Sequence, residues 1–354
     1  MRPGGLALGG LTLGAVARNS RGRTASGGTA GMRERDKTEG SSRREFLKTG
    51  AGWAAASMLP VLGGAGVGGE WLSASPLPVE NGSGAAGSIP TVRLNNGVAM
   101  PRLGFGTMTL KGDPGSVADA IALGYRLIDT AMIYNSEEAV GEGIRQSGIR
   151  REELFLTSKL WKTDMGYEPA KKGFQTSLDK LKTDYLDLYL IHRPSGGDWM
   201  GSWKAMEELY QAGRIRAIGM SNATPEQMNA LMADSRVKPA VHQIETHAFF
   251  QEDRAYDFLN QHGVQMEAWA PLAEGRDGLF TNGTLAAIGK KYKKTNAQVS
   301  LRWHFQRGIV AIPRSQQHGH RMENLNIFDF ELSDSDMAAI APLNLHKTLF
   351  PEWS

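Results

Sequence analysis

From residue 91 onward, short apolar runs alternate with amphipathic segments, and this alternation is what most constrains the fold of the chain. The apolar runs have the length of buried strands, whereas the segments between them repeat apolar residues every three or four positions, as helices do. Strands are predicted at residues 103–107, 127–131, 154–160, 186–192, 215–221, 240–246, 265–271 and 309–313. Helices are predicted at residues 116–123, 137–147, 170–181, 199–211, 225–232, 254–261 and 297–305.

Eight strands that alternate with helices over about 260 residues predict an α/β protein whose residues 91–354 form a closed (β/α)8 TIM barrel. The alternative is a doubly wound sheet, which usually has fewer strands or a second domain. An N-terminal β-hairpin at residues 92–101 is expected to close the bottom of the barrel. Residues 333–354 are expected to add a last helix and a short tail.

Residues 1–90 differ from the barrel, because they are rich in Gly, Ala, Ser and Arg and lack apolar periodicity. We expect a disordered N-terminal signal and linker region. Its one continuous motif is SRREFLK at residues 42–48, followed by an apolar, small-residue segment at about 51–64. This order is typical of a twin-arginine (Tat) export signal, although an arginine pair also occurs by chance in basic tails. The apolar segment is shorter than the about 20 residues of a membrane-spanning helix.

The use of this signal decides the expected compartment. If the signal is read, the chain engages the twin-arginine translocation machinery and the protein is periplasmic or otherwise exported. If it is not used, the protein is cytoplasmic.

The same region contains a false nucleotide motif. Residues 64–69, GAGVGG, match the G-x-G-x-x-G dinucleotide fingerprint. That fingerprint requires a strand before it and a helix after it, so that the backbone approaches a pyrophosphate. Here it lies between a signal and a Pro-containing linker, and we reject it.

Charge and cysteine content exclude several classes of function. The net charge is only +3, and from residue 100 the lysines and arginines are scattered among acidic residues. Nucleic-acid-binding proteins usually carry a clustered basic face instead. The chain has no cysteine, which excludes disulfides, thiolate catalysis and cysteine metal sites. We expect no nucleic-acid partner, no stable membrane span and a monomer.

Four polar side chains come from the carboxyl ends of three predicted strands, where a barrel carries its chemistry. The second strand delivers Asp129, with Tyr134 just beyond it, and the fourth ends at His192. Strict alternation along the third strand points Lys159 inward. A nearby lysine lowers the pKa of a tyrosine, and a buried carboxylate keeps that lysine charged. Tyr134 can then protonate a carbonyl oxygen that His192 holds while a hydride reaches the carbon.

Each of these residues also has a purely structural explanation. An aspartate at a strand end is often a helix cap, a lysine is usually a solvated surface charge, and a histidine before a proline is mostly a loop residue. The combination of the four types is what indicates proton transfer at a carbonyl.

A metal site at His242, Glu245 and His247 is the competing possibility. The two-residue period of a strand turns His242 away from the other two side chains and leaves Gln243 and Glu245 on the inward face. We therefore predict no metal.

Several spaced motifs resemble the aldo-keto reductase family across residues 91–343. They are MPRLGFGT at 100–107, IDTA at 128–131 with Tyr134, EEAVG at 137–141, DLYLIH at 187–192 and GMSN at 219–222. The resemblance implies a catalytic tetrad of Asp129, Tyr134, Lys159 and His192, with Tyr134 as general acid. It also implies hydride transfer from a nicotinamide cofactor to an aldehyde, ketone or sugar-derived carbonyl.

The resemblance further implies where the cofactor lies. Ser221, Asn222 and Gln243 would hold the nicotinamide carboxamide, and Trp269 would stack on the ring, although a large aromatic here also serves in barrel packing. The implied cofactor residues are Gly106, Thr107, Asp129, Ser221, Asn222, Gln243, Trp269, Leu272, Arg314, Ser315, His320, Glu323 and Asn324.

NADPH is favoured over NADH as the cofactor. In the family, a basic residue and a Ser or Thr hold the 2′-phosphate, and Arg314 and Ser315 match them, since an arginine fork suits phosphate. His320 stands in place of a second arginine and is a weaker, pH-dependent partner.

The substrate side departs from the family pattern at Arg193, where many members have tryptophan. We expect Arg193 and Trp161 to shape the substrate pocket, with Arg193 favouring a polar or anionic carbonyl compound. Two functions remain open. One is reduction of a small-molecule carbonyl substrate, and the other is NADP(H) binding or sensing by an exported protein with little turnover.

Overall fold

A computed structural model describes residues 88–110 and 112–353 of the protein. Its main sheet has eight parallel strands, and each strand pairs with its neighbours in the sequence. The strands are β3 (Phe105–Gly106), β4 (Leu127–Asp129), β5 (Phe155–Leu160), β6 (Leu186–Ile191), β7 (Ile215–Ser221), β8 (Val241–Glu245), β9 (Gln265–Trp269) and β10 (Val310–Ala311). All eight predicted strands are present.

The sheet closes between its first and last strands. Leu103, just before β3, forms a parallel bridge with Ala311 of β10, and the Gly104 amide donates to the Ala311 carbonyl over 2.9 Å. A Cβ at Gly104 would lie 2.6 Å from the Leu127 side chain and 2.9 Å from that of Ile312, so the packing around this closure leaves room only for glycine. The predicted (β/α)8 barrel is confirmed.

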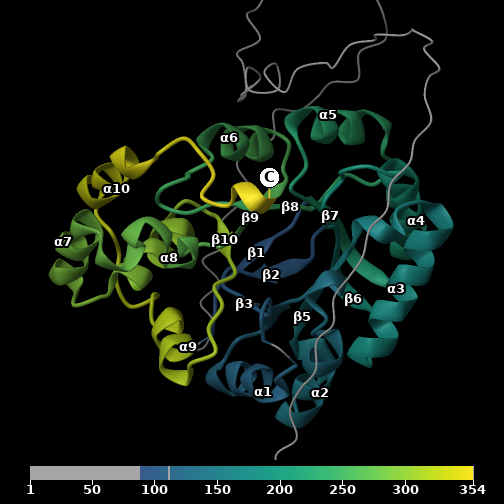
Figure 1. Cartoon of the computed structure of the whole chain (residues 1–354), viewed down its shortest axis with the longest axis horizontal. Coiled ribbons are helices and arrows are strands. Elements are labelled where there is room, and N and C mark those ends of the chain that lie inside the picture. Colours follow the sequence, from purple (N-terminus) through teal and green to yellow (C-terminus); the bar gives the residue numbers. More distant parts are fainter. Residues whose placement is uncertain (1–87, 111, 354) are drawn as a thin grey trace, which may run out of the picture. The chain divides into compact units, whose positions relative to one another are not determined.

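Helices surround the strands on the outside (Figure 1). They are α1 (Pro114–Leu123), α2 (Glu137–Ser147), α3 (Tyr167–Leu181), α4 (Trp199–Gln211), α5 (Pro225–Asp234), α6 (Asp253–Gln261), α7 (Gly283–Tyr292), α8 (Asn296–Gln306), α9 (His318–Leu325) and α10 (Asp334–Ile340). Every predicted helix is found, with boundaries that shift by no more than a few residues. The helix α7 was not predicted, because its two glycines and short apolar stretch give a weak periodic pattern. The side chain of Asn282 caps its first turn.

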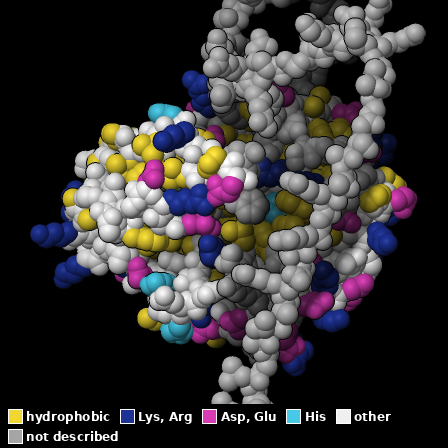
Figure 2. Space-filling view, viewed as in Figure 1, with side chains coloured by type: hydrophobic (Ala, Val, Ile, Leu, Met, Phe, Trp, Pro, Cys, Tyr) yellow, Lys and Arg dark blue, Asp and Glu magenta, His cyan; other side chains and the backbone are white. Residues whose placement is uncertain are grey.

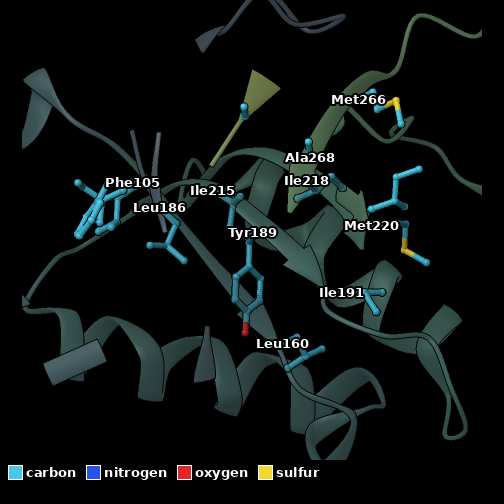
Figure 3. Close-up of a cluster of buried hydrophobic side chains, with 14 of the residues drawn as sticks. Phe105, Leu160, Leu186, Tyr189, Ile191, Ile215, Ile218, Met220, Met266 and Ala268 are labelled. Atoms are coloured by element: carbon cyan, nitrogen blue, oxygen red, sulfur yellow. The ribbon is translucent and has the colours of Figure 1, made fainter. Parts of the chain in front are cut away.

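Alternation along the strands separates two apolar regions. Outward-facing residues such as Tyr189, Ile191 and Met220 pack under the helices (Figure 3). Inward-facing residues such as Leu127 and Phe155, at the amino ends of β4 and β5, fill the lower part of the barrel. Because the lower interior is apolar, polar inward-facing residues are concentrated above it, toward the carboxyl ends of the strands.

The predicted hairpin is present as β1 (Thr91–Arg93) and β2 (Ala99–Pro101), which pair antiparallel. Its buried Met100 joins the inward-facing apolar cluster. The Asn95 and Asn96 amides at its turn donate to the carbonyls of Pro239 and Arg216, which lie at the amino ends of β8 and β7. The hairpin therefore covers the bottom of the barrel, away from the expected site.

The SRREFLK motif and the GAGVGG segment lie outside the described residues. Among residues 88–110 and 112–353, no helix is long and apolar enough to cross a membrane. On the face seen in Figure 2, Lys and Arg side chains are interspersed with Asp and Glu.

Candidate active site

A cavity of about 560 Å³ opens at the carboxyl ends of the strands. Three of the four predicted catalytic residues line it, and Lys159 lies directly behind them, fully buried. The lining residues are Gly106, Met108, Thr109, Asp129, Tyr134, His192, Arg193, Asn222, Gln243, Trp269, Ala270, Pro271, Leu272, Glu274, Phe280, Ile312, Pro313, Arg314, Ser315, Gln316, Gln317, His320 and Phe350.

The predicted tetrad meets in space. Lys159 points inward from β5, and its Nζ donates to Asp129 Oδ1 over 2.6 Å and to the Thr130 carbonyl over 3.0 Å. The same Nζ lies 3.4 Å from Tyr134 Oη. Burial lowers the pKa of Lys159, but the charge and hydrogen bond of Asp129, together with the charges of Tyr134 and Glu267, outweigh burial and raise that pKa above its usual value. The lysine is therefore a permanent cation beside the phenol.

The net pKa of Tyr134 differs from the expectation. Lys159 lowers the pKa of the phenol, as predicted, but burial raises it by more, so the pKa of Tyr134 lies above its usual value. Burial destabilises the phenolate more than the nearby Lys159 cation stabilises it, and the negative charge of Asp129 destabilises the phenolate further. Tyr134 therefore holds its proton. Because its oxygen accepts from Lys159, its own O–H remains available to donate into the cavity.

His192 lies directly after β6, and its ring packs edge-on between two aromatic side chains. The ring centroids lie 5.6 Å from Tyr134 and 5.1 Å from Trp161. Burial, together with the positive charges of Lys159 and Arg193, lowers the pKa of His192 well below its usual value. Its Nδ1 is buried without a hydrogen-bond partner among the described residues. His192 is thus a neutral imidazole, which can donate one N–H to an oxygen in the cavity.

Gln243 connects the tetrad to a carboxyl group that the sequence did not single out. Its Nε2 donates to Asp129 Oδ2 over 2.9 Å and to Glu267 Oε2 over 2.8 Å. Burial, reinforced by the charge of Asp129, raises the pKa of Glu267 to about 8. The two-residue period of the strand could have revealed Glu267, because it places Glu267 on the same inward face as Trp269. In the sheet, Glu267 is the register partner of Gln243. With both amide hydrogens used, Gln243 is left to present its carbonyl oxygen to the cavity.

The residues predicted to hold the nicotinamide gather on one wall. The Trp269 indole N–H donates to Asn222 Oδ1 over 2.8 Å, and Asn222 Nδ2 donates to Ser221 Oγ over 2.9 Å and to the His192 carbonyl over 3.1 Å. Ser221 is fully buried and reaches the cavity only through Asn222. Thr107 is also fully buried and lies behind the lining.

The predicted phosphate-binding residues Arg314 and Ser315 follow β10, the neighbour of β9 in the sheet. Arg314 donates to Glu274 over 2.8 Å and to the Thr109 hydroxyl over 2.7 Å. Ser315 and His320 also line the cavity.

Three residues of α9 are placed elsewhere. Glu323 accepts from the Thr295 hydroxyl, and Asn324 is buried; neither lines the cavity. Arg321 is buried too and pairs with Asp119 over 2.7 Å, so it lies behind the cavity wall while His320 faces the cavity.

The substrate end differs from the expectation in one respect. Arg193 lines the cavity as predicted. Trp161 does not line it, but its ring packs against His192, which does. The unpredicted neighbour is Phe350 of the C-terminal tail, whose ring packs against Trp269 at 5.2 Å. The tail is held by Glu245, which accepts from the Leu349 amide over 3.0 Å. Glu245 thus anchors the tail instead of lining the cavity. No local sequence pattern predicts this contact between β8 and the tail.

The described residues contain no cluster of His, Cys, Asp and Glu that could hold a metal ion. His242 is buried apart from Glu245 and accepts from the Ala223 amide over 3.2 Å. His247 instead pairs with Glu245 over 2.9 Å.

Comparison with known proteins agrees with this geometry. Residues 102–344 match the Aldo/keto reductase family. The chain is 46% identical over 264 residues to glyoxal reductase of Bacillus subtilis (strain 168), with 74% of this chain and 95% of that protein covered. It is 42% identical over 262 residues to 9,11-endoperoxide prostaglandin H2 reductase of Trypanosoma cruzi, with coverage of 73% and 93%.

Solved structures are similar as well. An aldo/keto reductase from Brucella melitensis is 43% identical with a TM-score of 0.70, with 73% of this chain and all of that chain covered. An aldo-keto reductase complexed with NADPH is 32% identical with a TM-score of 0.70, with coverage of 74% and 89%. The chain is an oxidoreductase and belongs to the aldo/keto reductase family.

Proposed function

We propose that the chain reduces a small aldehyde or ketone with NADPH and that Tyr134 is the general acid. The observation that carries this proposal is the phenol of Tyr134, which accepts a hydrogen bond from the buried cation Lys159 and faces the cavity with its proton in place. Relatives named glyoxal reductase and methylglyoxal reductase are 46% and 36% identical to this chain, which supports a carbonyl as the substrate.

Each tetrad member has a separate task. Tyr134 donates its proton to the carbonyl oxygen as negative charge develops there, and Lys159 stabilises the phenolate that remains. Asp129 keeps the lysine charged, and the neutral His192 donates a second hydrogen bond that orients the same oxygen. Bound NADPH supplies the hydride.

The cavity residues fit a dinucleotide phosphate. Asn222 and Gln243 present amide groups beside the plane of Trp269, which suits a nicotinamide carboxamide and its ring. Elsewhere in the cavity lining, Arg314, Ser315 and His320 offer a cation, a hydroxyl and an imidazole, which suit a 2′-phosphate. This set favours NADPH over NADH.

The test is a screen of purified protein against glyoxal, methylglyoxal and larger aldehydes, followed by the loss of reduced-nicotinamide absorbance. We expect steady NADPH oxidation, and a loss of about 10²–10⁴-fold in kcat in Tyr134→Phe, the usual range for removing a general acid. Tyr167→Phe, at an exposed tyrosine of α3, is the matched control. Tight NADPH retention without turnover of any carbonyl would instead support the binding or sensing function.

We also propose that the arginine pair at residues 43 and 44 directs export. The support is the sequence pattern of residues 42–64. Fusion of residues 32–90 to a reporter that is active only after export should give signal, and replacing Arg43 and Arg44 by lysine should abolish it. A reporter that stays cytoplasmic with the native pair would contradict the proposal.

A further inference from the structure

Arg193 lies in the wall of the cavity and has no side-chain partner among the residues that the structure describes. It follows His192 directly, lines the cavity and is half-buried. Within residues 88–110 and 112–353, its guanidinium makes no hydrogen bond or ion pair. Burial lowers its pKa from the usual value, and no carboxylate of the described part of the chain offsets that effect. An arginine is seldom held partly out of water without a counter-ion.

The other charges in the wall are compensated. Asp129 is paired with Lys159 over 2.6 Å, and Glu274 is paired with Arg314 over 2.8 Å. The guanidinium of Arg193 is therefore the unmatched fixed charge among the lining side chains that the structure describes. An anion that enters this part of the cavity meets it without competition from a neighbouring carboxylate.

The position of Arg193 distinguishes substrate from cofactor phosphate. Arg193 follows β6 and Arg314 follows β10, and these strands are four apart in a closed ring of eight. The two arginines therefore lie on opposite sides of the barrel mouth. Arg193 is on the side of His192, and its positive charge is among those that depress the pKa of that ring. This is the side on which the carbonyl would be reduced.

We infer that Arg193 binds a carboxylate on the carbonyl substrate, so that the site selects aldehydes or ketones that carry an acid group. The inference rests on the proposed function, because it names the substrate class of the same site. While His192 and Tyr134 hold the carbonyl oxygen, the planar guanidinium of the next residue can take both carboxylate oxygens. The reaction is unchanged: a hydride and a proton add to C=O, and the carboxylate stays ionised throughout.

The experiment compares 4-carboxybenzaldehyde with methyl 4-formylbenzoate, which differ mainly in charge. The measured quantity is the ratio of kcat/KM for the acid to kcat/KM for the ester, with NADPH saturating. We expect the wild-type protein to prefer the acid and Arg193→Met to lower the ratio by about 10- to 100-fold, the usual worth of a charge-assisted bond. Arg193→Lys keeps the charge without the fork and should recover part of the ratio.

Lys162→Met is the matched control. Lys162 is exposed on the turn after β5 and lies 5.6 Å from the ring of Trp161, but it does not line the cavity. Lys162→Met removes the same charge near the same opening. If its acid-to-ester ratio of kcat/KM stays within about threefold of the wild-type ratio, the effect of Arg193→Met comes from direct contact and not from long-range attraction.

Two results would overturn the inference. They are equal preference for acid and ester in the wild-type protein, and an unchanged ratio in Arg193→Met. If the unchanged ratio comes with a rise in the KM for NADPH in that variant, Arg193 belongs to the cofactor site. If the protein turns over neither aldehyde and no other carbonyl in the screen, the proposed function is rejected instead. If it turns over the ester but not the acid, only the inference that Arg193 binds a substrate carboxylate is rejected.

Discussion

The ammonium of Lys159 lies 2.6 Å from the carboxylate of Asp129 inside the barrel, where the two side chains are only 0% and 2% exposed. The desolvation cost of burying two opposite charges offsets most of their mutual attraction, so such a pair contributes little net stability. What it provides is a fixed positive charge 3.4 Å from the Tyr134 oxygen. We conclude that the pair is a functional element that the barrel tolerates.

Breaking this pair should destabilise the fold more than removing it. Lys159→Met leaves the Asp129 charge buried without its cation and should lower the free energy of unfolding by about 3–5 kcal/mol. The double variant Lys159→Met with Asp129→Leu should recover most of that loss. Urea unfolding of the two single variants and the double variant measures the coupling. If the two losses simply add, the pair is not the dominant interaction of either residue.

Activity should be insensitive to pH near the usual pKa of histidine. Burial and the charges of Lys159 and Arg193 depress the pKa of His192, so the ring stays neutral as pH falls below its usual value. With a neutral aldehyde, kcat/KM should show no inflection between about pH 5.5 and 7.5. A pH–rate profile tests this. An inflection near pH 6.5 that disappears in His192→Gln would contradict it.

Glu267 should make stability fall as pH rises. Its pKa is raised to about 8 from an ordinary 4.5, so the folded state binds this proton more tightly than the unfolded state. The stabilisation is complete below about pH 4.5 and is lost as pH rises through about 8. Glu267→Gln is neutral at every pH. The free energy of unfolding of this variant, relative to that of the wild-type protein, should therefore be about 2–5 kcal/mol higher at pH 9 than at pH 5.

Urea unfolding at these two pH values measures the difference. Glu168→Gln, at an exposed glutamate of α3, is the control and should show no such change. Equal pH dependence in the wild-type protein and Glu267→Gln would show that the buried carboxyl is already ionised at neutral pH.

Arg314 should govern the choice between NADPH and NADH. Arg314→Ala should raise the KM for NADPH about 10- to 100-fold and leave that for NADH much less affected, because only NADPH carries the 2′-phosphate. Glu274→Gln frees Arg314 from its ion pair of 2.8 Å and should shift the ratio of the two KM values in the opposite direction. Equal effects of Arg314→Ala on both cofactors would place the arginine elsewhere along the dinucleotide.

The sequence predicted the elements that depend on local pattern. The two-residue period of 155–160 placed Lys159 on the inward face, and the structure confirms that orientation. Asp129, Tyr134 and His192 were predicted to meet Lys159 because the strands of a barrel end at one rim. The local pattern also placed the hairpin at the opposite end.

Other features depend on contacts between distant segments. Phe350 packs on Trp269 although the two residues are 81 positions apart (350 − 269), and Glu245 and Arg276 both bind the tail that carries Phe350. The buried α9 residue Arg321 and the cavity-facing His320 are neighbours in sequence, yet packing against α1 separates their roles.

The alternation of strands and helices is a short-range property, so it is sufficient to specify the barrel and the rim where its polar residues gather. The electrostatics of that rim are long-range and depend on burial. Only the folded arrangement shows that Tyr134 keeps its proton despite Lys159, that Glu267 shares Gln243 with Asp129, and that Arg193 has no counter-ion among the described residues. The physical reason is that the charge state of a side chain depends on how much water it loses on folding and on which groups then surround it. Its immediate neighbours in the chain determine neither.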